Sequence, residues 1–172
     1  NFSKDLTQSE IDAATSASTA KRKSITYFQG AKGEEIADYT VNYKTGTTSV
    51  SGVSVNFYGA SKIRASAATS DDKLTMTANF SKDIAQADID TASAATTDKR
   101  KSLTYFQGDK GEEIADYTVS YKTGTTSISG VSVNFYGASK VRAIAATSDD
   151  KLVMTANFSK DISDSAILTA SS

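Results

Sequence analysis

The sequence contains no cysteine, histidine, proline or tryptophan among its 172 residues. Without cysteine, the chain cannot form disulfides, thiol catalysts or cysteine-zinc sites. Without histidine, it lacks the commonest general base and the commonest metal ligand, so Ser-His-Asp and Cys-His catalytic arrangements are impossible. We therefore expect that the protein is not an enzyme and uses no cofactor.

Long apolar runs and a strong charge of one sign are absent as well. No run of 18 apolar residues occurs, so we expect no helix that crosses a membrane. The net charge is −1, from 19 basic and 20 acidic residues, and a nearly neutral chain lacks the basic footprint of a nucleic-acid binder. The sequence therefore argues against nucleic acid and membrane insertion, and its composition is compatible with an exported protein.

An internal repeat of 78 residues dominates the sequence. The five residues 1–5 recur at 79–83 and again at 157–161, and 1–78 matches 79–156 without a gap at 62 of 78 positions. This period is too long for a solenoid and long enough for a small domain. We expect a piece of a longer tandem-repeat protein, divided into a first module (1–82), a second module (83–160) and the start of a third, divergent repeat (161–172).

Each module reads as a short helix followed by strands. The helix is expected over 5–17, capped by Asp5 or by the capping box that begins at Thr7. Apolar and polar residues then alternate around 24–27, 37–43, 53–57 and 74–80, which is typical of antiparallel strands with one buried face. We predict a mainly β fold of tandem, immunoglobulin-like β-sandwich modules, each with one short helix. Residues 74–84 contain neither glycine nor proline, so a stiff joint and an extended rod are expected.

Adjacent acidic residues are candidates for chemistry. Two acids can act together in glycoside hydrolysis, as at Glu34-Glu35, or bind calcium through oxygen ligands. Neighbours on an extended chain point to opposite faces, however, and no Asp-x-Asp-x-Asp-Gly loop is present. We favour solvated turn charges and no metal site. The weak candidates for calcium are Asp71, Asp72, Asp149 and Asp150.

One short motif resembles an enzyme signature. Tyr58 and Lys62 have the spacing of the catalytic Tyr-x-x-x-Lys of short-chain dehydrogenases. No glycine fingerprint accompanies it, and Gly59 after a strand indicates a turn. The resemblance therefore does not change the expectation of a non-enzyme.

Tyrosines form a candidate ligand surface. Consecutive aromatic residues in a strand, such as Tyr27 and Phe28, should place one ring outward. An exposed row of tyrosines could stack on a sugar or contact a protein. The candidate residues are Tyr27, Tyr39, Tyr43, Tyr58, Tyr105, Tyr117, Tyr121 and Tyr136.

A covalent cross-link is a further candidate. Stalk domains of bacterial pilins and adhesins often join a Lys to an Asn of the last strand beside a buried acid. Residues of the required types are Lys23, Asn79 and Asp38 or Glu35 in the first copy, and Lys101, Asn157 and Asp116 or Glu113 in the second.

Nearly identical modules rich in Ser, Thr, Ala and Gly, without Cys, Trp, His or Pro, resemble the stalk regions of bacterial cell-surface adhesins. A weaker, local likeness joins residues 65–84 to the inserted outer domains of flagellins and their cap proteins. The first resemblance implies an extracellular, surface-attached structural spacer that projects a distal domain and contacts neighbouring repeats. The alternative is a repeated, low-affinity binding module for a host glycan or protein that acts through avidity.

Overall fold

The computed structural model describes residues 1–2, 7–15, 21–81, 84–93, 99–159 and 162–170. The strands of the first copy are β1 (Ser24–Gln29), β2 (Ile36–Tyr43), β3 (Val50–Tyr58), β4 (Ile63–Arg64) and β5 (Leu74–Phe80). Those of the second are β6 (Arg100–Gln107), β7 (Ile114–Tyr121), β8 (Ile128–Tyr136), β9 (Val141–Arg142) and β10 (Leu152–Phe158). The helices are α1 (Gln8–Asp12), α2 (Gln86–Asp90), α3 (Asp164–Leu168) and the 3₁₀ turn η1 (Ala143–Ala145).

All ten strands belong to one antiparallel sheet. Its order is β1-β2-β3-β5-β6-β7-β8-β10, with β4 added to β3 and β9 added to β8. The mainly β, antiparallel prediction is confirmed. The tandem immunoglobulin-like sandwiches are not found: the described strands join one sheet within a single domain. The first copy does not close on itself, because β5 pairs with β6 of the second copy.

The two faces of the sheet differ in chemistry. On β3, Val53, Val55 and Phe57 are buried, whereas Ser54 and Asn56 alternate with them on the other face. The second face carries hydroxyl and amide side chains that bond across strands, as between Thr26 and Thr40 (3.0 Å). A face of this kind does not need a second sheet, because its polar groups are satisfied by one another and by solvent.

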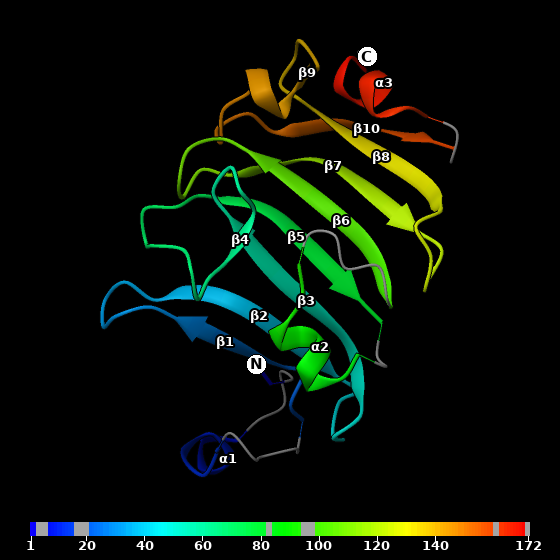
Figure 1. The fold of residues 1–172 in the computed structure, drawn as a ribbon. Helices are drawn as coiled ribbons and strands as arrows, with labels where there is room; N and C mark the ends of the chain where they lie inside the picture. The colour runs from blue at the N-terminus through cyan, green and yellow to red at the C-terminus, as the bar shows by residue number, and fades with distance from the viewer. Residues whose placement is uncertain (3–6, 16–20, 82–83, 94–98, 160–161, 171–172) are drawn as a thin grey trace.

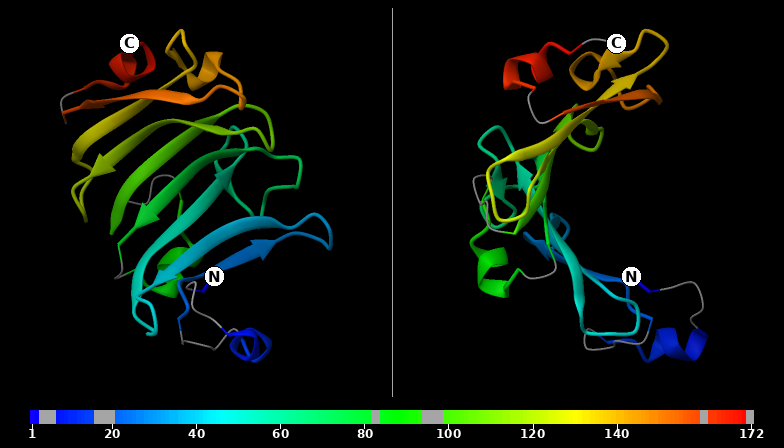
Figure 2. Two further views of the ribbon diagram at one scale, coloured as in Figure 1. Left: turned by 180° about the vertical axis from the view of Figure 1, so that it is seen from behind. Right: turned by 90° about the vertical axis from the view of Figure 1, so that its right-hand side faces the viewer.

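Short helices cover the apolar face instead. Ile89 of α2 (3% exposed) packs in one core cluster with Val55 and Phe57, and Ile167 of α3 packs with Phe135. Each helix therefore covers strands of the copy before its own. Helix α1 precedes the first strand and has no buried residue. Figures 1 and 2 show α1 beyond the β1 end of the sheet, while α2 and α3 lie on one face.

The helices are shorter than the sequence predicts. Of the expected 5–17, α1 spans Gln8–Asp12, and Asp5 lies outside the described residues. The capping box is confirmed: Glu10 N donates to Thr7 Oγ1 (3.3 Å), and Thr7 N donates to Glu10 Oε2 (2.8 Å). In the second copy the N-cap is Ala85, which has no side-chain acceptor, and only Ala85 N donates to Asp88 Oδ2.

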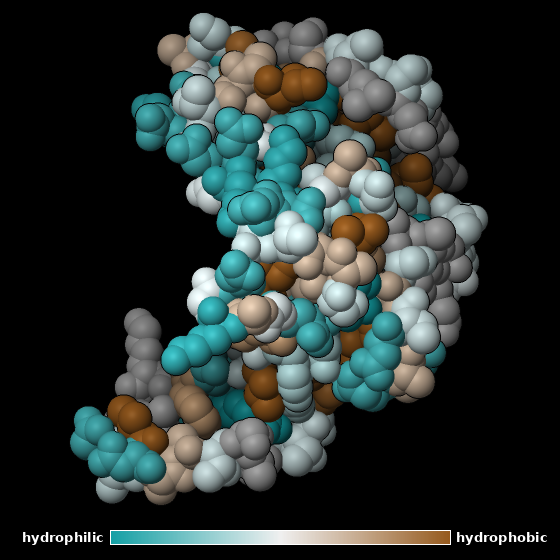
Figure 3. Space-filling model, turned by 60° about the vertical axis from the view of Figure 1, so that its left-hand side comes forward, coloured by the Kyte–Doolittle hydropathy of each residue, from teal (hydrophilic) through white to brown (hydrophobic). Residues whose placement is uncertain are grey.

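The sheet is strongly twisted, and the ends of the chain lie at its opposite ends along the direction of strand stacking (Figures 1 and 2). In space-filling view the molecule has a crescent outline, hollow on one side (Figure 3). The strands run across this long direction, so the expected rod of end-to-end sandwiches is replaced by a sheet that grows sideways. No helix in the described part of the chain is long and apolar enough to cross a membrane.

Candidate functional site: the junction between the repeats

The structurally distinctive region is the seam where β5 of the first copy meets β6 of the second. Ala78 pairs with Leu103, Thr77 with Thr104, and Asn79 with Ser102. Ala78 and Leu103 are 0% and 3% exposed and lie in the core cluster. On the polar face, Asn79 Nδ2 donates to Ser102 Oγ (3.1 Å). The seam is thus an ordinary interior part of the sheet rather than a linker.

Loop residues reinforce the seam at one end. The Lys73 ammonium donates to the carbonyl of Gly108 (2.9 Å), and Leu74 N donates to Glu113 Oε1 (3.0 Å). Glu113 Oε2 also accepts from Gly111 N (2.9 Å), so this carboxylate is oriented by its own loop before it meets β5. In the first copy Glu35 has the same loop bond, from Gly33 N at 2.9 Å. The loop of each copy is therefore built to receive a preceding strand.

A glycine is required at the start of that loop. Gly108 has φ of 116°, and a Cβ there would lie 2.5 Å from the carbonyl oxygen of Glu112. Only glycine combines this positive φ with so close a backbone approach. The same holds at Gly30, where the oxygen of Glu34 is also 2.5 Å away. Both copies therefore build the same receiving loop.

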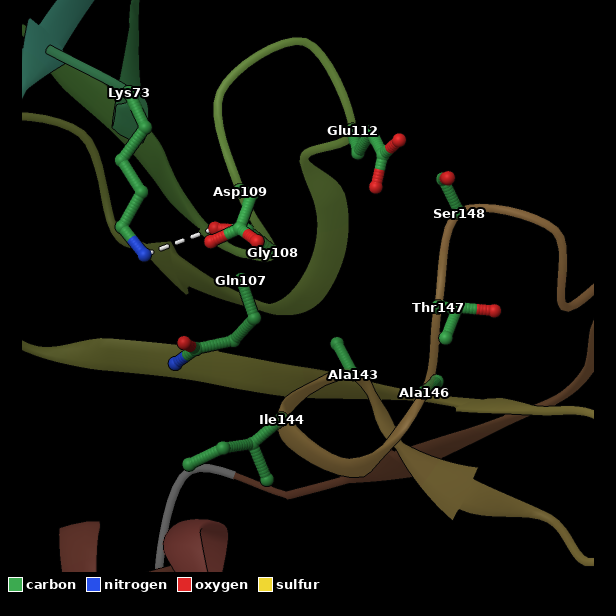
Figure 4. A pocket seen from close by; sticks show the side chains of 10 residues that line it. All are labelled: Lys73, Gln107, Gly108, Asp109, Glu112, Ala143, Ile144, Ala146, Thr147 and Ser148. Atoms are coloured by element: carbon green, nitrogen blue, oxygen red, sulfur yellow. Dashed lines mark hydrogen bonds between the residues drawn. The ribbon is translucent and has the colours of Figure 1, made fainter. Parts of the chain in front are cut away.

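An open pocket of about 290 Å³ lies beside this loop. Figure 4 shows that Lys73, the residue before β5, extends toward Gly108, with Asp109 close by, while Thr147 and Ser148 approach from the turn before β10. The ammonium and main-chain groups nearest the seam are used for holding the two copies together. No group of three or more potential metal-ligating side chains occurs in the described ranges.

A buried ion pair fixes the second-copy helix to the first-copy sheet. Arg64 Nε and Nη2 each donate to the Asp38 carboxylate at 2.8 Å, and Arg64 Nη1 donates to the carbonyl of Ile89 at the end of α2 (2.6 Å). Asp38 lies in a β-bulge, because Tyr39 and Ala37 take the successive partners on β1. The bulge allows a charged side chain on the otherwise apolar face.

The second copy repeats this arrangement. Arg142 Nε and Nη2 each donate to the Asp116 carboxylate at 2.7 Å, and Arg142 Nη1 donates to the carbonyl of Ile167 in α3. Arg64 and Arg142 were not among the sequence-predicted site residues. Two features of the sequence could have identified this pair. Arg64 follows the apolar Ile63 directly after a turn, and Asp38 is the single charged residue in the apolar-polar alternation of 37–43.

The tyrosines do not form the predicted exposed row. Tyr58 and Tyr136 are buried (7% and 6% exposed), and each donates its hydroxyl to a main-chain carbonyl at 2.5 Å, that of Ala37 or Ala115. Burial raises the pKa of both phenols, and it also raises the pKa of Tyr39. These rings anchor strands to one another, because a buried phenol that keeps its hydrogen bond packs as a large apolar group.

The other tyrosines pair with neighbouring side chains. Tyr27 stacks on Tyr39 and Tyr105 on Tyr117, with ring centroids 4.5 Å apart in each pair. The guanidinium of Arg22 lies 4.0 Å from the Tyr43 ring, and that of Arg100 lies 3.9 Å from the Tyr121 ring. Of the eight candidates, only Tyr27 is strongly exposed, at 40%. It lies on β1, where no preceding strand covers it.

The acidic turn residues have a local structural role. Asp72 accepts from the main-chain and side-chain donors of Thr69 (2.8 and 3.0 Å), and the main-chain bond lowers the pKa of its carboxyl group. Asp150 makes the same two bonds with Thr147 (3.0 and 3.1 Å). Asp71 and Asp149 are exposed. Asp72 and Asp150 therefore close their turns, and among the described residues no group of three or more potential metal ligands includes them.

The residues of the expected cross-link are not brought together. The carboxylate of Asp38 is bound by Arg64 on the core side, whereas the amide of Asn79 bonds with Ser54 and Ser102 on the polar face. Asn79 shares a polar-face hollow with Lys101 of the second copy and not with Lys23, and none of the residues around that hollow is acidic. In the second copy, Asp116 is bound by Arg142 and Asn157 by Ser132.

Comparison with protein-family models, curated proteins and solved structures finds no match. The seam is the feature of the molecule that bears on function, because it joins two copies of one sequence by the same kind of contact that holds each copy together.

Proposed function

We propose that the protein is a structural spacer in which each 78-residue unit extends one continuous sheet. The observation that supports this proposal is the β5–β6 seam: Met76 to Asn79 pair antiparallel with Tyr105 to Ser102 in consecutive register, and after a bulge Phe80 pairs with Arg100. A flexible linker would allow the units to move independently. A shared sheet makes them one mechanical body, as in proteins whose repeats are stabilised by contacts with their neighbours.

The geometry also sets how far each unit reaches. One copy contributes four strands to the main order of the sheet, and at a spacing of roughly 4.8 Å these add about 19 Å per unit. The number of copies would then set the distance between whatever precedes and whatever follows the repeats. An extracellular, surface-attached stalk of an adhesin or filament, carrying a distal domain, is the setting that we propose for such a spacer.

The shape test compares this chain with a chain that has one additional copy of residues 79–156. Small-angle X-ray scattering should show a single rigid particle whose longest dimension increases by about 19 Å, modified by the twist of the sheet. An increase typical of a whole separate domain, or a broad distribution of shapes, would contradict the proposal. Dilution controls are needed so that association does not contribute to the measured length.

A second function is supported by one recurring feature. The Tyr27–Tyr39 and Tyr105–Tyr117 stacks occupy equivalent positions. Each borders an open hollow, although the first hollow includes Arg64 and the second includes Lys62 instead. Stacked aromatic rings of this kind can bind sugars or apolar side chains, so a weak site would recur on every unit and act through avidity. Saturation-transfer NMR with a panel of mono- and disaccharides tests this alternative. Signal lost in Tyr105→Ala would support it, and no transfer to any sugar would argue for a protein ligand or none.

A further inference from the structure

The two outermost strands carry the same sequences as the two strands of the seam. β10 differs from β5 only where Val153 replaces Thr75. β1 corresponds to the matching part of β6, with Ile25 in place of Leu103. Within the described sheet, β1 pairs with β2 on one side, and β10 pairs with β8 on one side. The outer edge of β10 therefore has the chemistry that β5 presents to β6, and the outer edge of β1 has the chemistry that β6 presents to β5.

Side chains on the two outer strands are more exposed than their equivalents at the seam. Leu152 on β10 is 52% exposed and Phe28 on β1 is 58% exposed, whereas the equivalent Leu74 and Phe106 are half-buried at the seam. Ala78 is fully buried on β5, and its equivalent Ala156 on β10 is only half-buried. The same residues are thus covered where a second copy is present and uncovered where it is not.

Both edge strands lack two of the features that protect sheet edges. Natural edge strands avoid pairing with other chains by means of charged residues, prolines or bulges that turn the edge away. β1 and β10 contain no charged residue and no proline. The bulge of β10 at Val153 has its counterpart in β5 at Thr75, and there it does not prevent β5 from pairing with β6. On the outer side of β1, Ser24 already exchanges two main-chain bonds with Asn1 (2.7 and 3.3 Å), so the main-chain groups of this edge are placed for pairing.

Asn1 and Phe2 occupy part of the outer edge of β1 and imitate the end of a preceding β5. Phe2 bridges to Arg22, as Phe80 pairs with Arg100, and Asn1 Nδ2 donates to Ser24 Oγ (3.1 Å). The equivalent residues of β10 are again Asn157 and Phe158. An incoming β10 would therefore replace these two contacts with identical ones and add the pairs beyond them. The helix that follows Asn1 and Phe2 has no buried residue, so little packing opposes the exchange.

We propose that a second copy of this chain binds head to tail, its β1 edge pairing with the β10 edge of the first in the register of the seam. Met154 would face Tyr27, Thr155 would face Thr26, and Ala156 would face Ile25. Leu152 N would meet the Glu35 carboxylate, as Leu74 N meets Glu113. The contact is heterologous and does not close, so it generates open chains of copies. This inference rests on the seam of the proposed function.

The experiment exploits the two different edges. Thr26 and Thr155 direct their main-chain groups outward in this register, so proline at either position removes an outward donor without removing a main-chain bond inside the sheet. Each change also removes one side-chain bond, to Thr40 or to Asn134, and Thr26→Val and Thr155→Val are the matched controls for that loss. Sedimentation velocity of the unaltered chain should show monomers, dimers and larger species that increase with concentration. Thr26→Pro alone and Thr155→Pro alone should each remain monomeric. An equimolar mixture of the two should form dimers and nothing larger, because each variant retains one competent edge.

Two further variants keep the proposal testable if either proline disturbs folding. Deletion of Asn1 and Phe2 removes the competing segment and should strengthen association at least several-fold. Glu35→Ala should weaken it, whereas Glu34→Ala, at the exposed neighbouring position, should not. Circular dichroism and thermal unfolding provide the folding control for every variant.

The proposal is overturned if the unaltered chain stays monomeric at millimolar concentration, or if a single proline variant dimerises alone, which would indicate a like-with-like edge contact. It is also overturned if the deletion weakens association. Amide exchange at Thr77 and Thr104 separates the possible failures. Protection there without head-to-tail association leaves the spacer intact and removes only this inference, whereas rapid exchange at both amides removes both.

Discussion

The buried pair of Asp38 and Arg64 offers the sharpest energetic prediction. Both side chains are largely removed from solvent, at 5% and 14% exposed, and they are joined by two bonds of 2.8 Å. Removing one partner of such a pair leaves an uncompensated buried charge, which typically costs about 3–5 kcal/mol. Asp38→Ala should therefore lower the free energy of unfolding by that amount.

The measurement is urea denaturation followed by circular dichroism, with Asp116→Ala as the matched variant. Asp116 makes the same bonds to Arg142 at 2.7 Å and should cost a similar amount. Arg64→Ala and the double variant complete a cycle, in which the double variant should be much less destabilised than the sum of the two single changes. A loss below about 1 kcal/mol for Asp38→Ala would show a solvent-screened pair and refute the reasoning.

Three other predictions follow from equivalent positions. Ile89→Ala should lower the free energy of unfolding by about 2–5 kcal/mol. Ile11→Ala, at a position 51% exposed, should lower it by less than about 0.5 kcal/mol. Equal losses in urea denaturation would contradict the conclusion that each helix packs on the strands of the copy before it. Glu113→Ala, which removes the charged acceptor of Leu74 N in the preceding strand β5, should lower the free energy of unfolding by about 1.5–3 kcal/mol. Glu35→Ala should lower it by less, and the reverse order would mean that the seam bond is unimportant. Burial raises the pKa of the Tyr58 phenol in the folded protein. The neutral phenol therefore stabilises the fold fully below the unfolded-state pKa of about 10, and this contribution is lost as the pH rises through the folded-state pKa. Tyr58→Phe should make the free energy of unfolding fall less steeply above pH 10, and an unchanged pH dependence would contradict this.

Much of the local structure could be predicted from the sequence, because alternation depends only on which residues face the core. The expected strands at 37–43 and 74–80 correspond closely to β2 and β5. The short β4 was missed, since two residues are too few to show a period. The helix was expected to be longer than α1 or α2, although the capping box at Thr7 was correctly identified.

The arrangement of the strands could not be predicted in the same way. Alternation indicates that one face of a strand is buried, but it does not show what covers that face. A second sheet and a short helix would both produce the same alternating pattern. The helix residue Ile89 covers strands of the previous copy, a contact that no pattern within one module can reveal. Asp38 was correctly singled out as an acid that could be buried, but its partner is Arg64 and not a lysine, because the bulge on β2 directs it toward β4.

The central claim is that the two copies share one sheet, and the cross-strand contact at Ala78 and Leu103 tests it most directly. These residues are opposite one another in the seam, at a position that does not exchange main-chain hydrogen bonds, where the Cα atoms of an antiparallel pair lie about 4.5 Å apart. Leu103 differs from its first-copy equivalent Ile25, so the resonances can be distinguished. The account predicts a strong nuclear Overhauser effect between the two Hα protons in a dilute, monomeric sample. Its absence, with strong effects retained between β6 and β7, would show separate modules and contradict the account.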